Sequence, residues 1–252
     1  MGKRARRALS LGLALGATVV VATPAANAVT NVILGNVSQF TGPGGLDLSG
    51  NMVYAVNFSN DDPDLVVNGV TFLHDRQVIP GATFTGPNQV TPWQTKPEYG
   101  ATTDDNNLEQ IMHDIRWANA GAGQILAANL NVTTGNHYKL QVLISGNHSE
   151  SRVWDITIDG QQAVDEITSL GLTGTPYNVG SSTVWTYQFK APDSQINILM
   201  GNFFGANDGG DRNPIWQGLT LEELPIPEPA TFALVGLGAT VLVRRRQRHR
   251  EA

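Results

Sequence analysis

The sequence predicts a mainly β protein, built as a single β-sandwich of the jelly-roll type. Apolar and polar residues alternate with a period of two through most of residues 29–224. Turn residues separate the alternating segments, and Gly (27) and Pro (13) are both common. About nine or ten such segments follow one another, which is typical of a sandwich. Cysteine is absent, so the fold cannot depend on disulfides or thiolate metal sites.

The clearest strands lie in residues 137–145, 151–160 and 183–190, where apolar side chains fall on one face. The second of these ends in an Asp-Gly pair, which favours a hairpin turn. We expect Trp154 and Trp185 to lie in the core, because both occupy alternating strand positions. Further strands are expected in VTNVILG, MVYAVNFS, DLVVNGVTFL, ATFTG, GQILAANLNV, QINILMG and IWQGLTLEEL.

One segment interrupts the strand pattern. In DDNNLEQIMHDIRWAN the apolar residues recur at helical spacing, and Asn106 with Glu109 resembles a capping box. The pattern predicts one short amphipathic helix over residues 107–119, packed on the sandwich.

The N-terminus has the three parts of a secretory signal peptide. A basic stretch precedes an apolar run from Leu9 to Val21, and Ala26-Asn27-Ala28 forms a small-x-small cleavage site. We expect residues 1–28 to form this signal and cleavage to follow Ala28. The alternative is a retained membrane anchor, although the apolar run is short for one.

The C-terminus combines a proline-rich motif, an apolar segment and a basic end. Pro227-Glu228-Pro229 lie in an extended stretch, because proline continues neither helix nor central strand. Residues 230–243 follow without charge and predict a membrane helix of about 21 Å, which is short for a bilayer. Arg244, Arg245 and Arg246 open the basic end at 244–250 and would stop the chain on the cytoplasmic side.

These parts, in this order, resemble the PEP-CTERM sorting signal of Gram-negative envelope proteins. The same tail is also called an ice-binding protein C-terminal domain, a name that is no evidence for binding ice. The resemblance covers residues 225–252 and implies an exosortase-type membrane protease as partner. An ordinary tail anchor is the alternative. Either way the body is exported to the cell envelope, the cell surface or the extracellular matrix, and is anchored to the membrane at least transiently.

The charge distribution excludes nucleic-acid binding. Residues 29–226 hold seven basic and twenty acidic residues, a net charge of −13, whereas nucleic-acid binding requires a basic surface. No nucleophile or H-E-x-x-H motif occurs, and the histidines of the body are scattered. We therefore expect a protein that is not an enzyme.

Two acidic clusters have the composition of calcium ligands. One is NDDPD at 60–64, and the other comprises Asn207, Asp208 and Asp211. The alternative for each is a polar turn, because Asn, Asp and Gly favour turns. Ca²⁺ is thus a candidate cofactor, and no other is indicated.

Three aromatic residues are candidates for contact with a polysaccharide, whose sugar rings pack on aromatic faces. Trp93 and Tyr99 lie in a long polar segment, and Trp216 follows the second acidic cluster. The alternative is that these rings only hold loops against the sandwich.

The stretch from Tyr138 to Gly160 is similar to malectin and other galactose-binding-like jelly rolls. In these a Y-x-L-x-V strand leads to a D-I-x-I-D-G strand, as it does here. The resemblance implies the fold more than the ligand. The expected function is a non-catalytic envelope or matrix protein that binds polysaccharide. The alternatives are a purely structural or adhesive matrix protein and a glycan-active enzyme.

Overall fold

The computed structural model describes residues 34–58, 63–90, 92–93, 97–145, 152–168, 182–203 and 211–225. The signal peptide, the sorting motif, the membrane helix and the basic end expected from the sequence lie outside these residues. Within the described part of the chain, no helix is long and apolar enough to cross a membrane.

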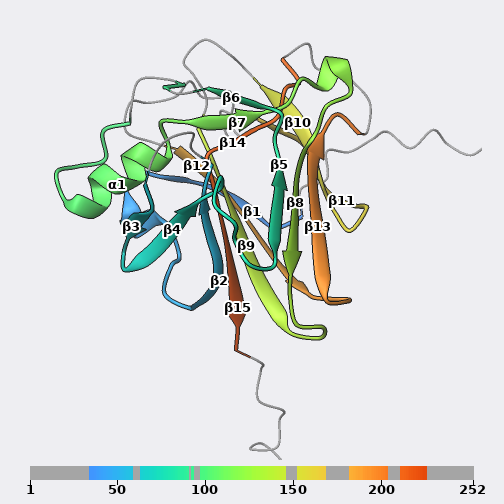
Figure 1. The fold of residues 1–252 in the computed structure, drawn as a ribbon, viewed down its shortest axis with the longest axis horizontal. Coiled ribbons are helices and arrows are strands. Elements are labelled where there is room, and N and C mark those ends of the chain that lie inside the picture. Colours follow the sequence, from blue (N-terminus) through green and yellow to red (C-terminus); the bar gives the residue numbers. More distant parts are fainter. Residues whose placement is uncertain are drawn as a thin grey trace, which may run out of the picture. The chain divides into compact units, whose positions relative to one another are not determined.

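Most of the body consists of two antiparallel-rich sheets, shown in Figure 1. The larger sheet contains, in spatial order, β1 (Asn36–Phe40), β12 (Ser182–Lys190), β9 (His137–Ile144), β15 (Gly218–Leu224), β2 (Asn51–Asn57), β4 (Val70–His74) and β3 (Leu65–Val67). The smaller sheet contains β11 (Gln161–Thr168), β10 (Val153–Ile158), β13 (Gln195–Gly201), β8 (Leu126–Asn131) and β5 (Ala82–Thr85). A third sheet of three short strands joins β14 (Ile215–Trp216), β7 (Ile115–Trp117) and β6 (Asn88–Val90).

The main core lies between the two large sheets, which confirms the mainly β sandwich predicted from the sequence. Leu140 and Val142 of β9 point into it, opposite Ile156 of β10 and Ile198 of β13. Trp154 and Trp185 are fully buried there, as expected from their strand positions.

A second core covers the outer face of the larger sheet, and the sequence pattern did not predict it. The helix α1 (Thr103–Ile111) and the segment 41–50, which includes the short helix η1 (Pro43–Gly45), pack over this face. The larger sheet is therefore buried on both sides over much of its area, so polar residues of its strands are covered too.

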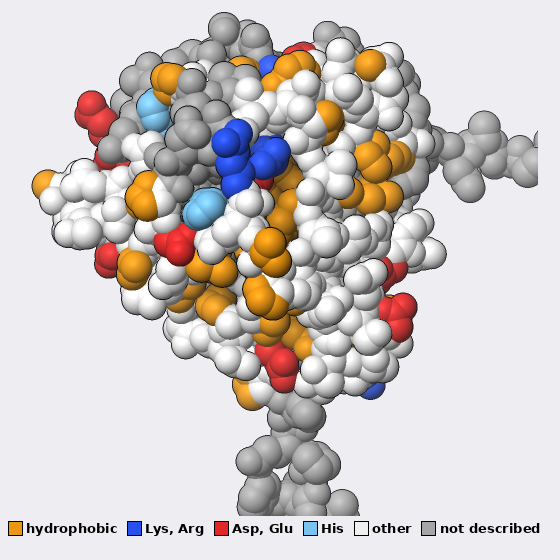
Figure 2. Space-filling view, viewed as in Figure 1, with side chains coloured by type: hydrophobic (Ala, Val, Ile, Leu, Met, Phe, Trp, Pro, Cys, Tyr) orange, Lys and Arg blue, Asp and Glu red, His pale blue; other side chains and the backbone are white. Residues whose placement is uncertain are grey.

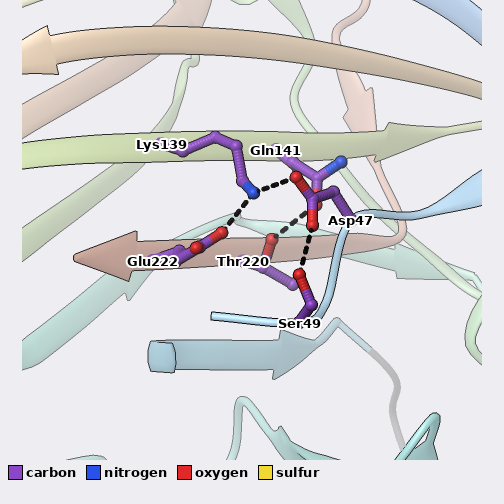
Figure 3. A network of polar contacts seen from close by, with 6 residues as sticks. All are labelled: Asp47, Ser49, Lys139, Gln141, Thr220 and Glu222. Carbon is purple, nitrogen blue, oxygen red and sulfur yellow. Dashed lines mark hydrogen bonds and ion pairs between the residues drawn. The ribbon is translucent and has the colours of Figure 1, made fainter. Parts of the chain in front are cut away.

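Lys139 of β9 is the clearest case. Its ammonium group forms ion pairs with Asp47 and with Glu222 of β15, and Figure 3 shows the three side chains converging. Its side chain is only 5% exposed. Burial alone would lower the pKa of Lys139, but the hydrogen bonds to Asp47 and Glu222 raise it overall. The hydrogen bond from Lys139 lowers the pKa of Asp47.

The helix is shorter than predicted and begins earlier. Thr102 caps it, and Asp105 completes the capping box. The prediction that Asn106 and Glu109 form the cap is therefore wrong. The helix ends at Ile111, and residues 115–117 form strand β7 instead of a last helical turn. β-Branched and aromatic residues favour strands, and β7 gains backbone partners from both β6 and β14.

The strand registers divide the sandwich into two ends. At the loop end, β2 and β9 finish at Asn57 and Ile144, β15 starts at Gly218, and the three-stranded sheet crosses. At the opposite turn end, β8 and β9 are joined through residues 132–136, and β15 finishes at Leu224. In Figure 1 the loop end is uppermost. The chain therefore continues toward residue 226 from the turn end.

Candidate functional site

At the loop end, one buried cation joins two of the residues predicted from the sequence. The guanidinium of Arg152 lies 4.8 Å from the centre of the Trp93 ring, in a cation–π contact. The same group pairs with the carboxylate of Asp211 at 3.3 Å, and it donates to the carbonyl of Asn213 at 3.3 Å. The structure thus brings Trp93 and Asp211 to one place, through a residue that was not among the predicted ligands.

Asp155, three residues after Arg152, holds neighbouring segments at the same end. Its carboxylate accepts hydrogen bonds from the amides of Glu166, at 3.1 Å, and Phe203, at 2.6 Å. Glu166 has a φ of 61°, a left-handed conformation that costs energy for a side chain of its size. Arg152 and Asp155 form an R-x-x-D pattern at the start of β10, which is the signal in the sequence that could have indicated this arrangement.

Trp216 is not available as an exposed platform for a sugar, contrary to its proposed role. Its side chain is fully buried and stacks on Phe58, with ring centres 4.2 Å apart. The strand β14 that carries it pairs with β7, which turns the ring into the main core.

Tyr99 is half-buried and belongs to the cover of the outer core. Its hydroxyl shares a 2.5 Å hydrogen bond with Ser182, and its ring lies 5.7 Å from that of Phe40. The Tyr99 amide donates to Glu109 of α1 at 2.8 Å. Tyr99 therefore contacts α1, Ser182 and Phe40, whereas Trp93 contacts Arg152.

Most of the buried polar atoms without a hydrogen-bond partner lie at the loop end, whereas the hydroxyl of Thr157 and one oxygen of Glu222, which forms an ion pair with Lys139, lie nearer the turn end. Among the described residues, both amide atoms of Asn57 and the indole nitrogens of Trp93 and Trp216 have none. The same holds for the indole nitrogen of Trp154, the amide nitrogen of Gln89 and one oxygen of Asp75. Each such group costs about 1–3 kcal/mol of desolvation, so a concentration of them indicates a place shaped for something other than stability.

Asp75 shows the effect of this environment on a charged group. Its side chain is fully buried and pairs with Arg116 of β7. Burial is the largest influence and raises the pKa of Asp75, while Arg116 partly opposes it. Figure 2 shows Lys or Arg side chains gathered at the centre of this face, beside apolar side chains.

The two proposed calcium clusters are only partly described. Asn207 and Asp208 lie outside the described residues, and Asp211 is paired with Arg152. Asp64 of the other cluster accepts hydrogen bonds from the His74 amide and the Gln77 side chain. Within the described residues, no group of three or more carboxylates and histidines is placed to hold a metal.

Three carboxylates at the loop end, those of Asp75, Asp155 and Asp211, are held in structural contacts. Trp93 is half-buried, and its ring and buried indole N–H lie beside the guanidinium of Arg152.

Comparison with solved structures shows the fold of the body. Plant receptor-like kinase ANX2 is 15% identical, with a TM-score of 0.53, over 71% of this chain and 51% of that one. The extracellular domain of ANXUR2 from Arabidopsis thaliana is 14% identical, with a TM-score of 0.51 and the same coverage. This chain thus spans about half the length of these chains, and at such identities the likeness shows only a β-sandwich fold.

A β-glucuronidase 2 of Bacteroides uniformis also aligns. It is 16% identical with a TM-score of 0.47, over 68% of this chain and 18% of that one. No curated protein matches the chain significantly.

One family profile matches the sequence, and it covers the C-terminal segment. The PEP-CTERM protein-sorting motif matches residues 225–247, which start directly after β15. The resemblance identified in the sequence is thereby confirmed. The chain carries a PEP-CTERM sorting motif, and it is an exported protein, targeted to an exosortase and transiently anchored in the membrane by its tail.

Proposed function

We propose that this chain is a non-catalytic protein of the cell surface or extracellular matrix that binds polysaccharide at its loop end. The observation that carries this proposal is the set of unpartnered buried polar atoms at the loop end, which includes the indole nitrogen of Trp93, together with the Arg152 guanidinium over the Trp93 ring. Sugars offer many hydroxyl groups, which can both donate to and accept from such atoms, and their ring faces pack on indole.

The direction in which the chain leaves the sandwich supports the same proposal. The sorting motif begins at the turn end, where β15 finishes at Leu224. The loop end therefore lies at the opposite end of the sandwich from Leu224, the last residue of β15. β15 has seven residues, which separate the two ends by roughly 23 Å along the strand.

Polysaccharide-array binding, with Ca²⁺ and with a chelator, tests the proposal on the chain that lacks only its signal peptide. We expect saturable binding to one polysaccharide class, lowered at least about tenfold in Trp93→Ala. Trp93→Phe keeps an aromatic ring but removes the indole N–H, so it should show an intermediate loss.

The control is Tyr187→Ala on β12. Tyr187 is also half-buried, and it stacks on Trp185 and Phe189 of its own strand in the larger sheet. Equal losses in Trp93→Ala and Tyr187→Ala would assign the effect to folding. Absence of binding in both conditions would overturn the polysaccharide proposal and favour the structural or adhesive alternative. Sugar release from a bound polysaccharide would instead favour the glycan-active enzyme.

A further inference from the structure

The larger sheet contains an opening between two strands that start apart and meet only at their ends. β2 and β4 run parallel, and the only paired residues are Val56 with Leu73 and Asn57 with His74. Toward the turn end the two strands diverge and leave a cavity of about 480 Å³, which we call the wedge. It is lined by Gly50, Met52, Val53, Tyr54, Ala55, Gly69, Val70, Thr71, Leu73, Ile79 and Pro80.

A β-bulge in β2 accounts for this divergence. Leu221 of β15 is opposite Tyr54, and the next residue, Glu222, is opposite Met52, so Val53 is the extra residue. A bulge bends its strand and increases its twist, and here it bends β2 at the level where pairing with β4 stops. Val53 itself is 37% exposed and lines the wedge.

The chemistry of the wedge suits an extended apolar peptide. Eight of the eleven lining residues are apolar and two of the others are glycines. In the described part of the chain, no strand pairs with residues 51–55 of β2 on the side facing β4. A strand edge of this kind binds an added peptide through its backbone groups, while apolar pockets take alternate side chains.

The course of the chain indicates which peptide is nearest. β15 is the other neighbour of β2, and Glu223 is opposite Asn51, so the chain leaves β15 beside the mouth of the wedge. Two strand spacings, about 10 Å, separate β15 from the wedge. In a polyproline conformation the five residues 225–229 would span about 15 Å, and an apolar segment beginning ATFAL follows them in the sequence.

We propose that the wedge receives the start of the chain's own apolar sorting segment, with Phe232 and Leu234 entering it before the segment inserts into the membrane. These two side chains lie two residues apart, so in an extended chain they share one face. Tethering through a short linker gives the segment an effective concentration in the millimolar range at the wedge. The wedge thereby covers part of an apolar segment that is otherwise exposed to water during export.

The absence of native cysteine allows a direct test by disulfide trapping in the full chain. Val53→Cys combined with Phe232→Cys places one thiol in the wedge and one in the segment. Val66→Cys with Phe232→Cys is the matched control, because Val66 is similarly exposed at 43% but lies on β3, outside the wedge lining. We expect an intramolecular disulfide at least about tenfold more abundant in the first pair than in the control.

Two results of the trapping experiment would overturn the proposal. Equal yields in the two pairs would show that the segment has no preference for the wedge. Mainly intermolecular disulfides through Cys at position 53 would assign the wedge to a second copy of the chain.

Amide hydrogen exchange provides a second readout without engineered thiols. In the unprocessed full chain, the amides of residues 53–55 and 70–72 should exchange at least about tenfold more slowly than in a Phe232→Ser, Leu234→Ser variant. The amides of β13, in the other sheet, should be unchanged between the two proteins. The same exchange rates in residues 53–55 of both proteins would contradict the proposal.

Discussion

The two ends of the sandwich differ in whether their buried polar groups have hydrogen-bond or ion-pair partners. At the turn end most of these groups are paired: Lys139 with Asp47 and Glu222, and the hydroxyl of Tyr54 with the carbonyls of Gly81 and Asn131. At the loop end both amide atoms of Asn57 and the indole nitrogens of Trp93 and Trp216 have no partner among the described residues.

This difference indicates that the buried polar groups of the turn end stabilise the fold, whereas those of the loop end destabilise it. A buried polar atom without a partner costs about 1–3 kcal/mol, and natural cores contain few of them. Departures from full pairing are expected where function requires particular groups. Changes at the turn end should therefore destabilise the fold, whereas changes at the loop end should affect binding more than stability.

The largest effect is expected for Lys139→Met at the turn end. Methionine keeps the length of the side chain but leaves Glu222, whose side chain is 7% exposed, without its cation. Removing one partner of a buried ion pair costs about 3–5 kcal/mol, and denaturant unfolding measures it. Lys190→Met at an exposed position is the control and should change stability by less than about 0.5 kcal/mol. A loss below 1 kcal/mol at position 139 would contradict the contrast between the ends.

A smaller loss is expected for Tyr138→Phe, also at the turn end. The Tyr138 hydroxyl accepts from the amide of Thr133 at 2.8 Å and donates to Glu223 at 3.2 Å. Phenylalanine leaves that amide unpaired and should cost about 1–2 kcal/mol. Tyr187→Phe is the control, since the Tyr187 hydroxyl has no hydrogen-bond partner among the described residues. Thermal unfolding of both variants would show whether the pairing or only the ring matters.

The opposite sign is expected for Asn57→Leu at the loop end. Asn57 is fully buried with both amide atoms unpartnered, so an apolar side chain of similar size removes a desolvation cost. We expect the free energy of unfolding to rise by about 1 kcal/mol, while polysaccharide binding falls. A strongly destabilised variant would show that Asn57 is paired in solution and would weaken the case for a binding site there.

The sandwich and its main core could be predicted from the sequence because period-two alternation depends only on local order. Trp154 and Trp185 followed from it. The burial of Lys139 could not be predicted this way, because its partner Asp47 is 92 residues away and the outer core depends on how segment 41–50 folds back. The spacing of Ile115 fitted a helix, yet this residue lies in strand β7 because its backbone pairs with β6.

The candidate site was predictable only in part, for the same reason. Trp93 and Asp211 were proposed from composition, and the structure brings both to Arg152. Trp216 was proposed by its position after an acidic cluster, but the pairing of β14 with β7 directs its ring into the core. Contacts between distant segments, which no local pattern contains, decide each of these outcomes.

The smallest expected effect is a difference in pH dependence between the two ends. At the turn end the pKa of Asp47 is lowered below its ordinary 3.8 and that of Lys139 is raised above 10.5. The ion pairs therefore contribute fully between about pH 4 and pH 10, and their contribution is lost as pH falls through the lowered pKa or rises through the raised one.

At the loop end the pKa of Asp75 is raised, because burial disfavours its charged form. The native state then binds a proton more tightly than the unfolded state, so stability should increase as pH falls through the raised pKa. Urea unfolding between pH 7 and pH 4 should show a rise of less than about 1 kcal/mol that disappears in Asp75→Asn and persists in Lys139→Met. A rise that disappears in Lys139→Met instead would place the titrating group at the turn end.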